Sequence, residues 1–185
     1  MINWQDMILI MSASVEMIWD DSARETYLAA GEVLFRAGDR VQRLFLVRAG
    51  VIRLVRPLPH GSSLTIQKAS AGQVLAEASL FASVYHCDGV TATQAVVRSV
   101  SVKRAITALE RDPVLARAFS RHLAESVQAA RARAEIVSLR TVSARVDAWL
   151  ALHSGELPTR GHWRDFAEEI SVAPEALYRE LASRR

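Results

Sequence analysis

The sequence predicts an α+β protein in which an N-terminal antiparallel β region is followed by helices. Short β-rich runs, broken by glycine and proline, fill residues 31 to 102. After Lys103 the composition changes to Ala, Arg, Leu and Glu, with no glycine until Gly155. Short strands at this spacing are typical of an all-β sandwich or barrel, and a glycine-free stretch of helix formers is typical of helices. We therefore expect a β domain at residues 1–111 that includes an N-terminal helical segment, a long helix at 112–140 and a helical domain at 141–185.

The bulk composition excludes several classes of protein. The chain has 185 residues, 50% of them hydrophobic, which suffices for buried cores. Its formal net charge of +3 and its pI near 9.5 are compatible with nucleic-acid binding but do not require it. The apolar run from Met7 to Met11 is far shorter than the roughly 20 residues that span a bilayer, and no secretory signal is evident. With Cys87 as the single cysteine, no internal disulfide can form, and we expect a cytoplasmic protein without a membrane partner.

The β region consists of runs that are separated by turn-forming residues. The turns are expected at Gly38-Asp39, Ala49-Gly50 and His60-Gly61, because each pair contains a residue that tolerates a positive φ. The expected strands are Glu32–Phe35, Arg43–Val47, Val51–Val55, Leu64–Ile66 and Val96–Val102.

A long helix is predicted to begin at Asp112-Pro113, which supplies an N-cap and a proline at the first helical position. It continues to about Ser138, a length near 40 Å at about 1.5 Å per residue. Small or apolar side chains recur along it three or four residues apart. This stripe fits either packing onto the β domain or a parallel two-helix dimer seam, in which the alanines allow close approach. The stripe consists of Leu115, Phe119, Leu123, Ser126, Ala130, Ala134 and Val137.

The C-terminal segment has the pattern of two short helices that share one small core. A preceding helix is expected at Val142–Leu152 and a link at Gly155–Gly161. From Trp163 onward, the apolar residues are divided by a break at 171–173, after which Pro174 occupies a position that needs no amide donor. The apolar set is Phe166, Ala167, Ile170, Val172, Leu177 and Leu181.

Polar side chains on the second of these helices point away from its apolar face. They are Glu175, Tyr178 and Arg179, near the end that enters the major groove in a helix-turn-helix. Arg179 could pair bidentately with a guanine, and Glu175 could accept a hydrogen bond from a cytosine amine. The alternative is a solvated helical hairpin with an i,i+4 Glu–Arg pair on its surface.

Four motifs together give the chain a family resemblance from about Leu28 onward. They are Ala30–Asp39, Leu44–Leu54, Gly72–Phe81 and Val172–Leu181, and their order and spacing are specific in combination. On these motifs the chain resembles the Crp/Fnr superfamily of bacterial transcription regulators. The resemblance implies a cyclic-nucleotide-binding-type β-roll, which is jelly-roll-like, a long dimerisation helix and a winged helix-turn-helix.

The resemblance also implies partners and DNA-reading positions. It implies a homodimer that binds double-stranded DNA, with RNA polymerase as a further candidate partner, and it places Glu175 and Arg179 where the family reads base edges. Pro174, the remaining DNA-contact candidate beside Tyr178, stands where the family often has Arg or Ser. The family continues past the recognition helix into a wing, whereas this sequence ends at Arg185. We therefore expect a helix-turn-helix without an evident wing, or one whose sequence is truncated. A sensor or protein-interaction dimer that no longer binds DNA is the alternative.

The resemblance bears on the effector as well. Members that bind cyclic nucleotides use a Gly-Glu pair and an Arg-Ser pair, and here these become Ala76-Glu77 and a position near His86-Cys87. No arginine lies between Glu77 and Arg98, so an anionic phosphate would lose its main counter-charge. The sequence therefore does not fit cyclic AMP, and the effector stays unknown.

The effector candidates are Glu77, His86, Cys87 and Asp88. Imidazole and thiolate at His86 and Cys87 suit Cu(I), Zn(II) or haem iron, and a thiol beside a histidine can have a lowered pKa and oxidise readily. The alternatives are another small ligand or purely structural roles: an apolar filler for Cys87, a satisfied or exposed polar group for His86 and a turn at Asp88-Gly89.

Catalysis has no support in the sequence. No P-loop, HExxH motif or Ser–His–Asp spacing is present, so we expect a protein that is not an enzyme. The remaining histidines form no ligand-spaced cluster; they are His60, His122, His153 and His162.

Overall fold

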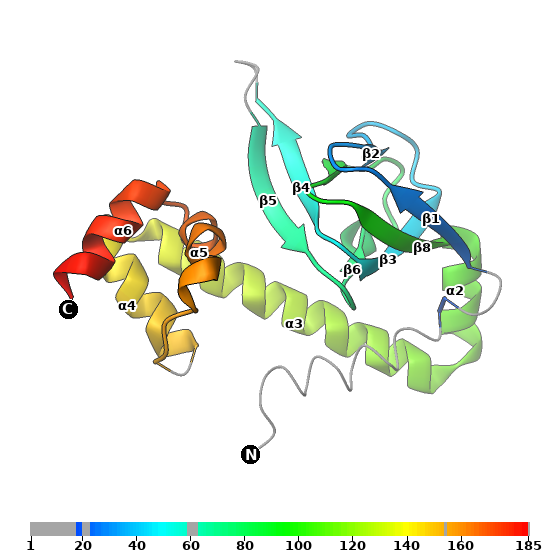
Figure 1. The fold of residues 1–185 in the computed structure, drawn as a ribbon. Helices are drawn as coiled ribbons and strands as arrows, with labels where there is room; N and C mark the ends of the chain where they lie inside the picture. Colours follow the sequence, from blue (N-terminus) through cyan, green and yellow to red (C-terminus); the bar gives the residue numbers. More distant parts are fainter. Residues whose placement is uncertain (1–17, 20–22, 59–62, 154, 185) are drawn as a thin grey trace. The chain divides into compact units, whose positions relative to one another are not determined.

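The computed structural model describes residues 18–19, 23–58, 63–153 and 155–184. The chain divides into two compact units, residues 1–123 and 124–185, and each is described by itself. The first unit contains the strands, and the second contains a bundle of helices (Figure 1). The three-part division at residues 111 and 140 stays a prediction.

Two antiparallel four-stranded sheets build the first unit (Figure 1). One has the strand order β1-β8-β3-β6 and the other β2-β7-β4-β5. The strands are β1 (Arg24–Leu28), β2 (Val33–Phe35), β3 (Arg43–Ala49), β4 (Ile52–Pro57), β5 (Ser63–Ala69), β6 (Val74–Leu75), β7 (Asp88–Thr91) and β8 (Ala95–Ser101). This is the antiparallel β-roll expected, without closure into a barrel.

Strand β3 is buried along most of its length. Its residues 44–47 are all less than 9% exposed, a continuous apolar run rather than an alternating one. Such a run is typical of a strand covered on both faces. Helix α2 (Val102–Arg111) packs on β3 and β8, and Leu115 and Phe119 belong to the same hydrophobic core as β3.

Aromatic rings fill the interior of the β-roll. The ring of Phe35 lies 4.3 Å from that of Tyr85 and 5.5 Å from that of Phe45, between centroids. Gly89 faces Phe35 so closely that a Cβ atom there would lie 2.7 Å from the ring. A glycine is therefore needed at residue 89 for this aromatic packing.

Helix α3 (Pro113–Ser138) begins as the sequence predicts. The Asp112 carboxylate accepts hydrogen bonds from the backbone amides of Val114, at 2.8 Å, and Leu115, at 3.1 Å. This N-cap satisfies amides that the first helical turn leaves without partners.

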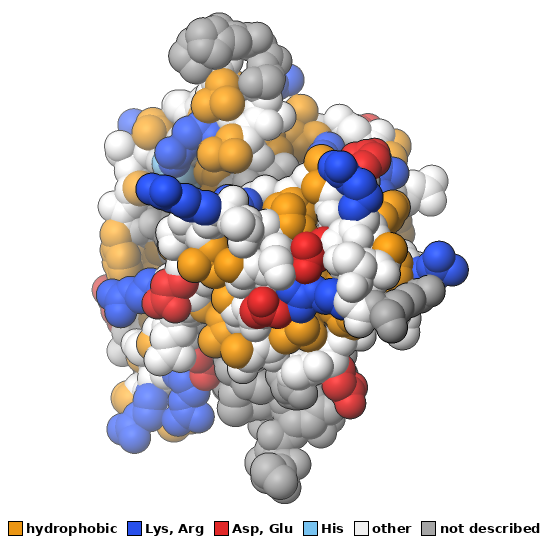
Figure 2. Space-filling model, turned by 90° about the vertical axis from the view of Figure 1, so that its left-hand side faces the viewer, with side chains coloured by type: hydrophobic (Ala, Val, Ile, Leu, Met, Phe, Trp, Pro, Cys, Tyr) orange, Lys and Arg blue, Asp and Glu red, His pale blue; other side chains and the backbone are white. Residues whose placement is uncertain are grey.

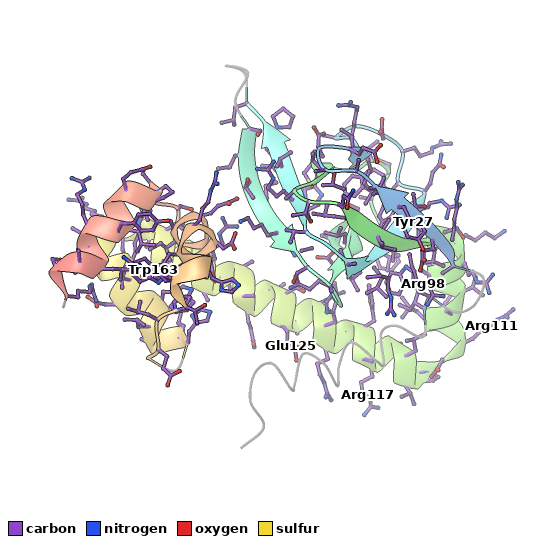
Figure 3. The ribbon with its side chains drawn as sticks, viewed as in Figure 1. Tyr27, Arg98, Arg111, Arg117, Glu125 and Trp163 are labelled. Carbon is purple, nitrogen blue, oxygen red and sulfur yellow. The ribbon has the colours of Figure 1, made fainter. Side chains whose placement is uncertain are left out.

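Three helices and a 3-10 turn complete the second unit. They are α4 (Val142–Leu152), η2 (Arg160–His162), α5 (Trp163–Glu169) and α6 (Pro174–Ser183). They share a core with the end of α3, and Figure 3 shows Trp163 among their side chains. The buried members of that core are Ile136, Val146, Trp149, Phe166, Ala167, Ile170, Leu177 and Leu181.

The expected elements are largely confirmed, with three strands missed. All five expected β runs contain a strand, although Val102 begins α2 instead of ending β8. Strands β1, β6 and β7 were not expected, and the turn interpretation of Asp88-Gly89 is wrong, because both residues pair with β4. Gly38 and Gly50 have the positive φ expected of their turns. The His60-Gly61 turn and the N-terminal helical segment lie outside the described residues.

Candidate functional site

Helices α5 and α6 occupy the segment in which the sequence predicts a helix-turn-helix. Residues 170–173 connect them, and Pro174 is the first residue of α6. Its missing amide costs nothing at this position. Leu177, 0% exposed, and Leu181, 3% exposed, fix the buried face of α6.

The turn between α5 and α6 contains one strained residue. Ser171 has φ 54°, in the left-handed region that favours glycine. The backbone amide of Val172 donates to the Ala167 carbonyl oxygen at 2.9 Å. The Arg145 guanidinium of α4 donates to the carbonyl oxygens of Ile170 and Ser171 at 3.0 and 2.8 Å. Arg145 was not among the residues predicted from the sequence, and its place as the one basic residue of α4 is the only signal that could have singled it out.

The predicted base-reading residues lie on the exposed side of α6. Glu175 and Arg179 are exposed and four residues apart, so they share a face of the helix. Within the described part of the chain, neither side chain makes a hydrogen bond, ion pair or ring contact. Tyr178, 43% exposed, is tilted against the Trp163 ring at 5.8 Å, and Pro174 is half-buried. The helix thus presents Glu175 and Arg179 to a partner more freely than Tyr178.

The charges of the second unit balance. Between residues 124 and 185 the sequence has nine arginines and nine acidic residues, so the formal net charge is zero, and residues 1–123 carry the whole +3. On the side that Figure 2 shows, basic side chains are scattered among acidic and hydrophobic ones. The unit therefore has no net positive charge with which to attract phosphates nonspecifically.

Arg184 is part of an ionic network on α4 and α6. Its guanidinium donates to Asp147 Oδ1 at 2.5 Å, to Glu180 Oε1 at 2.7 Å and to the Ser143 carbonyl oxygen at 2.9 Å. The hydrogen bond from Arg184 lowers the pKa of Glu180, and the hydrogen bond to Asp147 raises the pKa of Arg184. This network engages Arg184 within the unit.

In the first unit, Ala76 and Glu77 lie in a tight turn whose first residue is left-handed. Ala76 has φ 66° and ψ 14°, a left-handed conformation that costs a non-glycine residue roughly 1–2 kcal/mol. Glu77 begins the short 3-10 turn η1 (Glu77–Ser79) and is only 9% exposed. Burial raises the pKa of Glu77, and a hydrogen bond from its own backbone amide lowers it by less. The net effect of the fold is to disfavour the charged form of this carboxyl relative to an exposed glutamate.

His86 and Cys87 face different surroundings. Cys87 is 2% exposed, whereas His86 is exposed and its Nδ1 lies 3.3 Å from Ser79 Oγ. Among the residues that the structure describes, no three or more His, Cys, Asp or Glu side chains form a group that could hold a metal ion. A metal or haem at His86 and Cys87 therefore stays a prediction that rests on these two side chains alone.

The chemistry of Cys87 differs from the redox interpretation. Burial raises the pKa of the Cys87 thiol; Arg56 lowers that pKa, and Asp88 and Glu77 raise it further. The net direction is opposite to the lowered pKa on which easy oxidation depends. These electrostatic interactions also mean that Cys87, Asp88 and Glu77 lie in one neighbourhood, as the sequence predicts.

Arg56, on β4, supplies a positive charge that was not predicted from the sequence. It lies outside the stretch from Glu77 to Arg98 that holds the other candidates, and it acts on Cys87 from another strand. β4 pairs with β7 through Val55 and Asp88, which places the next residue beside this site. The fourth candidate, Asp88, accepts a hydrogen bond from the Ala37 amide at 2.7 Å, a contact that ties β7 to the β2 turn.

The predicted dimer stripe on α3 divides into three sets. Leu115 and Phe119, each 4% exposed, lie in the core of their own chain, which makes the packing interpretation right for these two. Leu123, Ser126 and Val137 are half-buried, and Ala130 and Ala134 are exposed. Arg117 and Glu125 project from the same helix (Figure 3). The seam stays a prediction for the five residues from Leu123 to Val137.

No helix among the described residues is both long enough and apolar enough to cross a membrane.

Comparison with known proteins matches the chain to regulators. The family model of the cyclic nucleotide-binding domain matches residues 25–112. The chain is similar to CLP of Xanthomonas campestris, a c-di-GMP responsive global regulator, with 18% identity, a TM-score of 0.67 and coverage of 92% of this chain and 90% of that one. No curated protein sequence matches the chain.

Two further solved structures have the same fold. FixK2 from Bradyrhizobium japonicum is 18% identical, with a TM-score of 0.70 and coverage of 87% of this chain and 83% of that one. A CRP-family transcriptional regulator from Thermus thermophilus is 19% identical, with a TM-score of 0.60 and coverage of 85% and 83%. At such identities the likeness is one of fold.

Proposed function

We propose that the chain is a dimeric, DNA-binding transcription regulator. The premise is that residues 25–112 match the family model of the cyclic nucleotide-binding domain and that the chain has the Crp/Fnr fold. A small-molecule signal in the β-roll shifts the long helices and so re-aims the two recognition helices. The proposal includes neither catalysis nor a resident metal.

The exposed Glu175 and Arg179 carry this proposal. They lie four residues apart on α6, whose opposite face is buried by Leu177 and Leu181. A guanidinium can pair bidentately with guanine and a carboxylate can accept from cytosine, so one helix face can read neighbouring bases. In a dimer joined along α3 from Leu123 to Val137, two such faces would meet DNA together.

The signal is proposed to act near Glu77, Cys87 and Arg56. The Glu77 carboxyl, whose pKa is raised by burial, can hydrogen-bond a polar group of a ligand, and Arg56 can pair with an anionic group. The Xanthomonas regulator of the same fold responds to c-di-GMP, an anionic ligand. An anionic small molecule is therefore the class of effector that the site suits best.

The experiment is selection of a duplex from a random pool, followed by binding of wild type and Arg179→Ala. The variant should lose about tenfold or more in discrimination against a duplex with one guanine replaced, equivalent to about 1–3 kcal/mol. Arg111→Ala is the control, because Arg111 is an exposed arginine of α2 in the first unit. Equal discrimination by wild type and Arg179→Ala would contradict the role of Arg179.

A second candidate function is a sensor dimer that does not bind DNA. The balanced charge of residues 124–185 favours it, since phosphate neutralisation by Lys and Arg supplies most nonspecific DNA affinity. Failure of every duplex to enrich at low salt, with a dimer present, would support this function over the first.

A further inference from the structure

One guanidinium in the second unit binds the backbone both at the end of α3 and at the turn between α5 and α6. Arg145 Nη2 donates to the Val137 carbonyl oxygen at 2.9 Å, and its Nε donates to the Leu139 carbonyl oxygen at 2.8 Å. Its Nη1 donates to the carbonyl oxygens of Ile170 and Ser171 at 3.0 and 2.8 Å. The first pair of oxygens lies at the end of α3, and the second lies at the turn before α6.

These four oxygens lie at or just past the C-terminal ends of α3 and α5, where carbonyl groups need hydrogen-bond donors. The last carbonyls of a helix have no partner inside it, and a positive charge there also interacts favourably with the helix dipole. α3 has no basic residue in its last turn, and neither does α5. Arg145, half-buried, serves both helices from its place in α4.

The turn that Arg145 holds is also the strained one. Ser171 adopts φ 54°, which a serine keeps only where its surroundings fix it. The carbonyl of this residue accepts the shortest Arg145 contact at the turn, 2.8 Å. Val172 and Pro174 follow directly, so the orientation of the Ser171 peptide sets where α6 begins.

We propose that Arg145 is the positioning residue that transmits movement of the end of α3 to the turn that orients the recognition helix. The inference rests on the proposed function, in which α3 carries the signal. A shift of the Val137 and Leu139 carbonyls moves the guanidinium, and the guanidinium moves the Ile170 and Ser171 carbonyls. A lysine cannot replace it, because one ammonium cannot present rigidly separated donors to both ends at once.

A double-mutant cycle on amide exchange tests this proposal in the absence of DNA. Glu135→Gly weakens α3 at an exposed position one turn before its end. In wild type this change should raise the exchange rate of the Val172 amide roughly tenfold, the size expected when a charge-assisted hydrogen bond is lost. In Arg145→Lys the exchange rate is already raised, and adding Glu135→Gly should change it less than about twofold.

The matched control is Arg184→Lys, which alters another arginine of the same unit that makes several hydrogen bonds. Arg184 binds Ser143, Asp147 and Glu180 but neither α3 nor the turn. In that background Glu135→Gly should keep its roughly tenfold effect. Equal effects of Glu135→Gly in all three backgrounds would overturn the proposal, because a residue that only stabilises the fold contributes additively.

A measurement on proteins with Arg145 intact keeps the proposal testable if Arg145→Lys fails to fold. Proton exchange at Arg145 Nε, which donates to Leu139, is followed by NMR in wild type and in Glu135→Gly. Exchange at Nε and at the Val172 amide should rise together. A rise at Nε with an unchanged Val172 amide would overturn the proposal. Coupling in a protein that binds no duplex would uphold the role of Arg145 and contradict only the proposed function.

Discussion

The two units differ in the charged group that lies beside their strained residue. Each has one described non-glycine residue with positive φ beside its candidate site, Ala76 in the first and Ser171 in the second. Ala76 is buried and precedes Glu77, whose pKa is raised by burial. Ser171 is exposed and its carbonyl is held by the Arg145 guanidinium.

This difference indicates how each unit can respond. In the first, burial raises the pKa of Glu77, so a ligand that hydrogen-bonds or pairs with that carboxyl changes the stability of the turn around it. The second keeps Arg145 and Arg184 hydrogen-bonded to carbonyl or carboxylate oxygens, so it responds to displacement of those oxygens. One unit is suited to sensing a chemical change, and the other to transmitting a geometric one.

Glycine substitutions at Ala76 and Ser171 should change the free energy of unfolding by different amounts, which is the largest difference expected between the two units. Ser171→Gly removes roughly 1–2 kcal/mol of left-handed strain and adds about 0.5–1 kcal/mol of backbone entropy, so it should stabilise by about 0.5–1 kcal/mol. Ala76→Gly also loses a buried methyl worth about 0.8 kcal/mol, so its net effect should be near zero. Urea unfolding of both variants measures this difference.

A larger gain in the free energy of unfolding for Ala76→Gly than for Ser171→Gly would contradict this prediction. It would mean that strain in the first unit is not offset by burial of the Ala76 side chain.

Glu77→Gln should have a smaller effect, visible in the pH dependence of stability. The folded pKa of Glu77 lies above its ordinary 4.5, so from about pH 4.5 up to that pKa the native state binds more protons than the unfolded chain. Stability from Glu77 therefore falls as pH rises through this window. Burial lowers the pKa of His122 below 6.5, so stability from His122 rises as pH rises toward 6.5.

Without Glu77, the rise in stability with pH that His122 causes should no longer be offset by a fall from Glu77. The free energy of unfolding of Glu77→Gln should then rise more steeply between about pH 4.5 and 6.5 than that of wild type, measured by urea titration at several pH values. Parallel curves for the two proteins would show that folding does not raise the pKa of Glu77.

Local patterns predicted most of the fold. The Asp112-Pro113 cap and the apolar spacing from Phe166 to Leu181 act within a few residues, so the sequence shows them directly. Strand β7 was missed because its Asp88-Gly89 pair resembles a turn, and only the packing of Phe35 against Gly89 explains the glycine. That packing joins residues 54 positions apart, which no local pattern reports.

The site was predictable to a similar extent. Glu175 and Arg179 follow from helical periodicity, and the structure leaves both exposed. Arg56 and Arg145 act across strands or helices distant in sequence, at Cys87 and at Ser171, and periodicity does not reveal such contacts. The same limit applies to Leu115 and Phe119, whose spacing fits a dimer seam and an internal core equally well.

The central claim is most directly tested by footprinting the full chain on a duplex selected by it. The account predicts two protected segments whose centres lie about 34 Å apart, one DNA turn, as expected for a dimer with two recognition helices. A single protected segment, or none at low salt, would contradict it.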